Sequence, residues 1–183
     1  MHPPIPRVPA VPAPAPADRD LEARLTDAMA SVVAGARRRA LRDGDRQIDT
    51  AHLLHSVMET DPEVRAVFDG APQVARVLGY LVQRSIGYGL RWQGSVEDSG
   101  ALPLLDQPGW SPAAVTAMEG ALARAEARGD VRVGGTDLLA ALAADPECRA
   151  VVVLDHAGVD ARELAERLVG APPSRQVSQG WRS

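Results

Sequence analysis

The sequence repeats itself at a spacing of 85 residues, and this repeat limits the folds that the chain can adopt. After a one-residue deletion, segment 61–67 recurs as 145–151 with six of seven residues identical. Self-similarity at a fixed spacing indicates copies of one structural unit that pack together to bury a common core. The other equivalent positions are Thr26 and Ser111, Gly44-Asp45 and Gly129-Asp130, Ile48 and Val133, and Leu53-Leu54 and Leu138-Leu139.

Each copy has the pattern of four helices. Thr26 and Ser111 are typical N-cap residues, and apolar residues follow each of them at intervals of three or four. Asp49 predicts a second cap, Asp61-Pro62 a third helix start, and a fourth helix follows from about residue 73 to 86. We therefore predict an all-α fold in which two tandem four-helix repeats pack about a pseudo-two-fold axis as an eight-helix domain.

The predicted domain occupies residues 24–170, with repeat one at 24–87, a linker at 88–109 and repeat two at 110–170. Residues 1–23 form a Pro/Ala-rich arm, for which extended, disordered chain is expected because such a segment cannot build a core. Residues 171–183 are expected to be a flexible tail. A monomer is expected, and the spacing of apolar residues predicts no membrane span.

Composition excludes several classes of function. All 20 basic residues are arginine, and without lysine the chain can form neither a P-loop nor the lysine site of a protein kinase. The net charge of −4 argues against a nucleic-acid-binding protein. With a single cysteine, no hydrolase or metalloprotease motif and no signal-like N-terminus, we expect a cytoplasmic protein that is not an enzyme and holds no cofactor or metal.

Several motifs resemble the Clp amino-terminal domain, the double repeat at the front of AAA+ unfoldases of the ClpC and ClpA kind. Family repeats run from a Thr-capped helix to a Gly-His or Gly-Asp pair, and continue Ile-Gly-Thr-Glu-His-Ile-Leu-Leu. This sequence has Leu25-Thr26-Asp27 and residues 48–54 in the first repeat. Its second repeat has Trp110-Ser111-Pro112, residues 133–139, and later 157–160 as Ala-Gly-Val-Asp.

The resemblance implies a stand-alone recognition domain without the ATPase modules, which binds protein or peptide ligands such as Clp subunits, adaptors or clients. It further implies a role as adaptor, decoy or regulator of Clp-dependent proteolysis. The alternative is a regulatory scaffold that binds a transcription or stress factor independently of Clp. In some ClpC proteins, a Thr and the Glu of Gly-Thr-Glu-His hold phosphoarginine. Ala51 and Thr136 occupy these Glu positions here, so the pocket lacks both carboxylates.

Four residues at the two helix starts are the candidate partner-binding residues: Leu25, Thr26, Trp110 and Ser111. Two-fold packing should bring these helix starts near each other, on one side of the junction between the repeats. The family has an aromatic residue at the Trp110 position, which in some ClpC proteins lies beside a hydrophobic groove. Trp110 could therefore anchor a partner, or it could pack against its own helix as residues before an N-cap often do.

Three other groups of residues are predicted to be structural. His52 and His55 share a helix face with Asp49, but no motif supplies the further ligands that a metal needs, so packing or a helix-end role is expected. Cys148 takes the place of Val64 and is expected to pack as a small apolar residue. Arg37-Arg38-Arg39 and Arg42 spread around a helix and predict a solvated face, with an acidic partner as the alternative.

Overall fold

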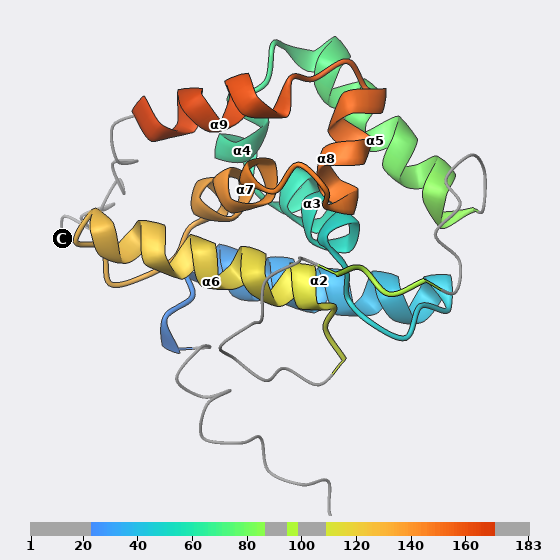
Figure 1. The fold of residues 1–183 in the computed structure, drawn as a ribbon, viewed down its shortest axis with the longest axis horizontal. Helices are drawn as coiled ribbons and strands as arrows, with labels where there is room; N and C mark the ends of the chain where they lie inside the picture. The colour runs from blue at the N-terminus through green and yellow to red at the C-terminus, as the bar shows by residue number, and fades with distance from the viewer. Residues whose placement is uncertain (1–22, 87–94, 99–108, 171–183) are drawn as a thin grey trace, which may run out of the picture.

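The computed structural model describes residues 23–86, 95–98 and 109–170, and within these ranges it contains the eight predicted helices (Figure 1). No helix in these ranges has the length and apolar character that spanning a membrane requires. Repeat one comprises α2 (Asp27–Asp43), α3 (Thr50–Thr60), α4 (Pro62–Ala66) and α5 (Ala71–Ser85). Repeat two comprises α6 (Pro112–Ala127), α7 (Gly135–Ala144), α8 (Arg149–His156) and α9 (Ala161–Gly170). The all-α double repeat is thus confirmed.

The first helices of the two repeats begin and end in the same way. Thr26 Oγ1 accepts a hydrogen bond from the Met29 backbone at 3.2 Å, and Ser111 Oγ accepts one from Ala114 at 3.1 Å. Both predicted N-caps are therefore present. Past the far ends of these helices, Gly44 and Gly129 have φ values of 74° and 76°, a left-handed conformation that glycine adopts without steric cost. The equivalent motifs in sequence give equivalent helix boundaries.

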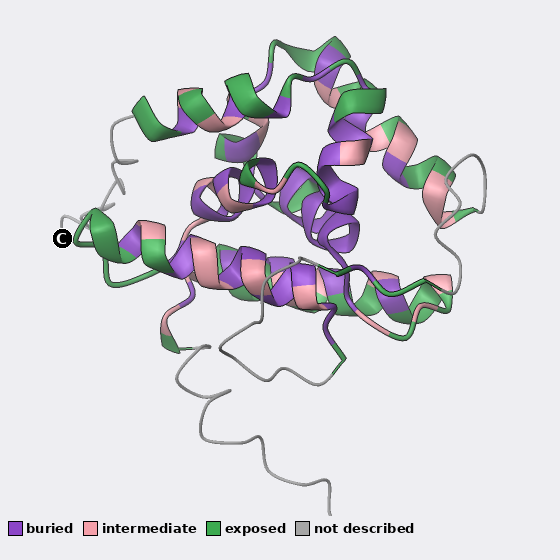
Figure 2. Cartoon of the chain, in the orientation of Figure 1, coloured by how far each residue is buried: buried purple, intermediate pink, exposed green. Residues whose placement is uncertain are grey.

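The second helix of each repeat, α3 in repeat one and α7 in repeat two, lies at the centre of the molecule. Every residue from Thr50 to Met58 of α3 is buried, and α7 is buried along most of its length (Figure 2). The remaining helices cover these two, with α2 packed on α3 and α6 packed on α7. The paired leucines that repeat in sequence supply the centre of the core, and all four of them are 0% exposed.

The two repeats are joined by reciprocal backbone pairing. Leu25 forms a parallel β-bridge with Val133, and Trp110 forms the equivalent bridge with Ile48. The Thr26 backbone donates to Val133 O at 3.2 Å, and the Ser111 backbone donates to Ile48 O at 2.8 Å. Each bridge crosses from one repeat to the other, and the 85-residue offset converts one bridge into the other. This reciprocity is the pseudo-two-fold relation that the repeats predict.

The geometry of the crossings corrects one expectation. The helix starts at Thr26 and Ser111 do not come together on one side of the junction, because α2 and α6 run in opposite directions (Figure 1). Each start instead lies at its own β-bridge, against the opposite repeat. Two-fold symmetry makes the two places equivalent, but it does not make them adjacent.

The third helices differ although their sequences are nearly identical. In repeat one, the Asp61 carboxylate accepts from the Glu63 backbone at 2.9 Å, and α4 begins at Pro62. In repeat two, Asp145 makes the same contact with Glu147 at 3.1 Å, but α8 begins only at Arg149. The predicted arm at 1–23, except for Ala23, and the tail at 171–183 lie outside the described residues, as does most of the predicted linker at 88–109.

Candidate binding groove and the junction between the repeats

The four residues predicted to bind a partner lie at the two crossings between the repeats. Leu25 and Trp110 are each 6% exposed, Ser111 is buried, and Thr26 is half-buried. Leu25 and Trp110 belong to the hydrophobic core, so their side chains pack the junction. Contact between these four residues and a partner stays a prediction, and the small exposed area shows that any such contact is limited in the conformation described.

A buried carboxylate that the sequence did not single out connects the repeats beside Trp110. Glu97 is 5% exposed, and it lies in the short described part of the predicted linker. One oxygen of its carboxylate, Oε2, accepts from the Thr50 backbone at 2.8 Å and from Ser111 Oγ at 3.1 Å. The other, Oε1, accepts from the Arg149 backbone at 2.6 Å and from the Thr50 hydroxyl. Glu97 therefore caps both α3 and α8.

This contact explains why α8 begins where it does. The Arg149 backbone donates to Glu97, and the next backbone N–H, that of Ala150, donates to Thr50 Oγ1 at 3.0 Å. The first N–H groups of a helix have no partner within the helix, and a carboxylate is well suited to accept from them because of the helix dipole. No sequence motif in residues 95–98 predicts that Glu97 caps a helix.

Asp49 is the second buried carboxylate at the junction. It accepts from the His52 backbone at 2.8 Å, from an Arg149 guanidinium nitrogen at 2.8 Å, and from Arg84. Burial alone would raise the pKa of Asp49, but the hydrogen bonds from His52 and the charge of Arg84 together hold that pKa below its usual range. Arg149 also donates to Ser95, in the same segment as Glu97. Asp49 is thus paired with two arginines, and Arg149 connects it to the segment that carries Glu97.

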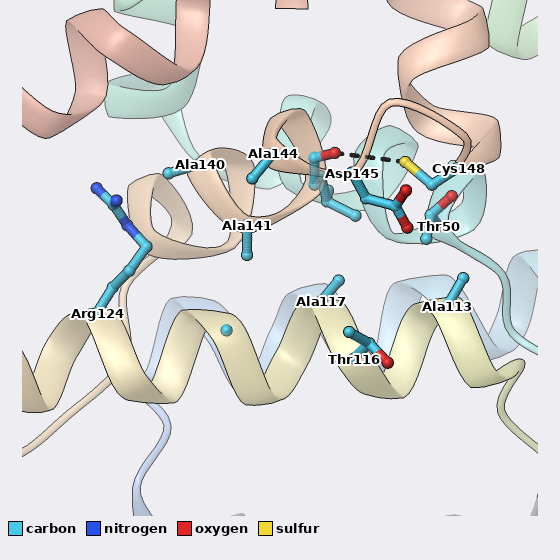
Figure 3. Close-up of a pocket in the computed structure, with 12 residues that line it drawn as sticks. Thr50, Ala113, Thr116, Ala117, Arg124, Ala140, Ala141, Ala144, Asp145 and Cys148 are labelled. Atoms are coloured by element: carbon cyan, nitrogen blue, oxygen red, sulfur yellow. Dashed lines mark hydrogen bonds between the residues drawn. The ribbon is translucent and has the colours of Figure 1, made fainter. Parts of the chain in front are cut away.

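A groove lies next to these contacts, between α6 and α7 (Figure 3). Its volume is about 390 Å³. Methyl groups of Ala113 and Ala117 on α6 face α7, and Ala141 of α7 points back towards α6. Thr50 and Cys148 lie at one end of the groove, and Arg124 lies at the other. The lining residues are Thr50, Ala113, Thr116, Ala117, Gly120, Arg124, Ala140, Ala141, Leu142, Ala144, Asp145 and Cys148.

Comparison of the two repeats explains why a groove forms here. At the close approach of α6 and α7, a Cβ on Gly120 would lie 3.3 Å from the Cβ of Ala141. The equivalent approach in repeat one is between Gly35 and Ser56. Beside this approach, repeat one has large side chains. Repeat two has alanines at the same positions, and these leave the space between α6 and α7 unfilled. The substitutions, repeat one first, are Val32 to Ala117, His55 to Ala140 and Glu59 to Ala144.

Among the described residues, the arginine at the end of the groove has no acidic partner, whereas its equivalent in repeat one has one. In repeat one, Arg39 pairs with Glu59. The equivalent arginine of repeat two is Arg124, and Ala144 stands where the carboxylate would be. The Arg124 guanidinium donates to Leu168 O at 3.3 Å, while its Nε is buried and has no hydrogen-bond partner among the described residues. Within the part of the chain that the structure describes, the groove therefore ends at a guanidinium without a carboxylate partner.

The remaining candidates from the sequence are Cys148, the two positions of the family glutamates and the arginine cluster. Cys148 is 0% exposed, its Sγ donates to Leu142 O at 3.3 Å, and burial raises its pKa to about 11. Ala51, at the first family glutamate position, is 0% exposed, while Thr136 at the second is half-buried. Of the arginine cluster, Arg37, Arg38 and Arg42 are exposed.

The two candidate histidines do not share a site. His55 Nε2 lies 3.2 Å from Glu59 Oε1, whereas His52 Nε2 lies 3.0 Å from Asp45 Oδ2. Burial and the charge of Arg39 lower the pKa of His55 to about 4. His52 also completes the cap of α3, because its Nδ1 lies 3.0 Å from the Asp49 backbone nitrogen.

Comparison with known proteins identifies the fold. No protein-family model matches the sequence, and no curated protein matches it. Among solved structures, the chain is similar to the N-terminal domain of the Clp-protease-associated chaperone ClpD from Arabidopsis thaliana, with 17% identity and a TM-score of 0.58. It is also similar to a structure from an investigation of a malarial protein secretion system, with 13% identity and a TM-score of 0.57. Each match covers 80% of this chain and 92% of the other. The chain has the fold of a Clp N-terminal domain.

Proposed function

We propose that the protein is a non-catalytic binding module that holds a peptide segment of a partner protein in the groove between α6 and α7. The observation that carries the proposal is the groove itself, about 390 Å³ in volume and lined mostly by alanine, glycine and leucine. Concave, mainly apolar sites with a few polar groups are the usual form of ligand pockets. The fold of a Clp N-terminal domain is consistent with a part in recognising substrates or adaptors of Clp-dependent proteolysis.

The chemistry of the groove favours a peptide with an acidic residue among small apolar ones. Repeat one provides the template, since its own Glu59 carboxylate binds Arg39 at the equivalent place. A ligand carboxylate would restore the missing partner of Arg124, and a charge-assisted hydrogen bond to a guanidinium is among the stronger polar contacts. Alanine-lined walls leave room for small side chains beside it.

The predicted partner residues have a positioning role in this proposal. Trp110 and Ser111 fix the first turn of α6, from which Ala113 reaches the groove. Leu25 and Thr26 hold the equivalent place at the start of α2. An adaptor, a decoy and a regulator of proteolysis would all use such a groove, so the proposal extends to each of these roles.

The test introduces at Ala144 of repeat two the glutamate that repeat one has at the equivalent position, Glu59. Peptides selected from a random displayed library on the intact protein would be measured by fluorescence anisotropy. We expect selected peptides to contain Asp or Glu, and Ala144→Glu to weaken their binding by at least about tenfold, because the new carboxylate would pair with Arg124.

The matched control is Ala123→Glu, which adds the same charge to an exposed position of α6 outside the groove. This variant should bind the peptides as the unaltered protein does. Equal weakening by both variants would point to general charge repulsion, and unchanged binding by Ala144→Glu would place the peptide elsewhere. Either result contradicts the proposal.

A further inference from the structure

The first described residues of repeat one lie beside the groove of repeat two. Arg24 forms an ion pair with Glu126 of α6, and its carbonyl oxygen accepts a hydrogen bond from the Val133 backbone at 2.8 Å. Figure 1 shows this segment next to the loop that joins α6 to α7. Glu126 is two residues from Arg124 on α6, a rise of about 3 Å along the helix axis. The Pro/Ala-rich arm therefore joins the domain near the Arg124 end of the groove.

The arm has the composition that the groove favours. Residues 12–17 alternate proline and alanine, and Asp18 follows them directly. An acidic residue after a run of small apolar ones matches alanine-lined walls that end at the Arg124 guanidinium. Residues 18–22 contain three carboxylates and one guanidinium, a formal net charge of −2. The end of the arm that lies nearer to Arg124 in the chain is thus opposite to it in charge.

The arm is long enough to bring Asp18 to Arg124. Asp18 lies six residues before Arg24, and six residues span about 20 Å when the chain is fully extended. A helix with its side chains is about 10–12 Å across. The six residues are therefore sufficient to pass from the Arg24–Glu126 ion pair around α6 and into the groove.

The length of the Pro/Ala run matches the length of the groove. Ala113 and Arg124 lie at its two ends on α6 (Figure 3), and a helix of this length measures about 16 Å. A polyproline II helix rises about 3.1 Å per residue, so the distance from Ala13 to Asp18 is also about 16 Å in that conformation. With Asp18 at Arg124, residues 13–17 would lie along the alanines of α6 and α7.

We propose that residues 13–18 occupy the groove of their own chain, with the Asp18 carboxylate on the Arg124 guanidinium, and thereby regulate the access of partner peptides. This inference rests on the proposed function, because the arm and a partner peptide use the same site. An extended Pro/Ala segment loses little conformational entropy when it binds. The contact between Asp18 and Arg124 is a charge-assisted hydrogen bond, which is stronger than a neutral one.

The covalent link between the arm and the domain determines how strongly the arm competes. A short linker gives an effective concentration in the millimolar range. If the free segment binds with a dissociation constant of about 0.1 mM, the arm occupies the groove in about nine chains of ten, and a partner peptide binds about tenfold more weakly. The arm thus excludes weakly binding peptides and admits those with high affinity.

The first test examines the groove without a partner peptide. Methyl NMR spectra of alanine-labelled protein would be compared between the full chain and a variant that lacks residues 1–18. We expect the signals of Ala117, Ala140 and Ala141 in the groove to shift, and that of Ala36 in the core of repeat one to stay in place. Asp18→Asn in the full chain should shift the same groove signals in the same direction, because it removes the charge that binds Arg124.

The second test measures competition by fluorescence anisotropy, with the library peptides selected for the groove. These peptides should bind the variant without residues 1–18 about tenfold more tightly than they bind the full chain. The matched control lacks only residues 1–7, which leaves segment 13–18 in place, and it should behave as the full chain does. A synthetic peptide of residues 10–20 should bind the truncated protein, and Ala144→Glu should weaken that binding.

The outcomes separate this inference from the proposed function. Unshifted groove signals, with equal peptide affinity for the full and truncated chains, would overturn the role of the arm and leave the groove as a peptide site. Selected peptides that bind outside the groove would contradict the proposed function, while the methyl signals would still decide whether the arm occupies it. Methyl shifts that grow with protein concentration would place the arm of a second copy in the groove and overturn the intramolecular contact.

Discussion

Replacement of Glu97 should reveal how much the junction between the repeats depends on one carboxylate. Its two oxygens accept four hydrogen bonds, from two donors of Thr50 and from Ser111 and Arg149. Glu97→Ala leaves the backbone N–H groups of Thr50 and Arg149 buried without a partner, and each such group costs about 1–3 kcal/mol. We expect the free energy of unfolding to fall by about 3–5 kcal/mol in total.

Glu97→Gln should cost less, about 2 kcal/mol, because the amide keeps one acceptor oxygen. That oxygen can serve only one pair of donors, while the NH₂ group faces the other pair. Urea denaturation followed by circular dichroism at 222 nm measures both losses. Glu147→Ala is the control, since this glutamate lies two residues before Arg149 in repeat two but is exposed. A loss below about 1 kcal/mol for Glu97→Ala would refute the reasoning, because the donors would then have other partners.

Two further predictions concern buried rings. Trp110→Ala should lower the free energy of unfolding by about 3–5 kcal/mol in urea, because Trp110 is 6% exposed; a loss below about 1 kcal/mol would contradict its packing role. Burial and Arg39 lower the pKa of His55 to about 4, so the unfolded chain takes up its proton first, near pH 6.5, and stability should fall by about 1–3 kcal/mol from pH 6.5 to 4. His55→Gln should flatten this part of the pH profile, and an unchanged slope would contradict the assignment.

The sequence was sufficient for the helical architecture because the signals involved are local. Thr26 and Ser111 cap helices through contacts with residues three positions away, and Gly44 and Gly129 end them through their own backbone conformation. Such features depend on neighbours in the chain. Because each of them occurs in both repeats, the sequence provides the evidence for each helix boundary twice. The resemblance of these motifs to the Clp amino-terminal domain agrees with the fold that was found.

The candidate sites were harder to predict because they depend on contacts between distant residues. Glu97 lies in a stretch without periodicity, and its role appears only when α3 and α8 bring their N-termini to it. The two carboxylates beside His52 belong to Asp43, at the end of α2, and to Asp45, in the turn after it. The groove could have been suspected from the repeat, since Ala144 replaces Glu59 while Arg124 keeps its equivalent, Arg39.

The two bridges between the repeats have a consequence for the origin of the fold. Each repeat contributes one residue before its first helix and one before its second, and these are the two complementary halves of the contact. A single repeat would therefore carry a self-complementary surface, and two identical copies could form both bridges at once, as in an isologous homodimer. Joining two such copies in one chain frees them to diverge, since a substitution no longer appears on both sides of the axis. An alanine-lined groove in one half and an imidazole–carboxylate cluster in the other are asymmetries that a homodimer of identical chains cannot hold.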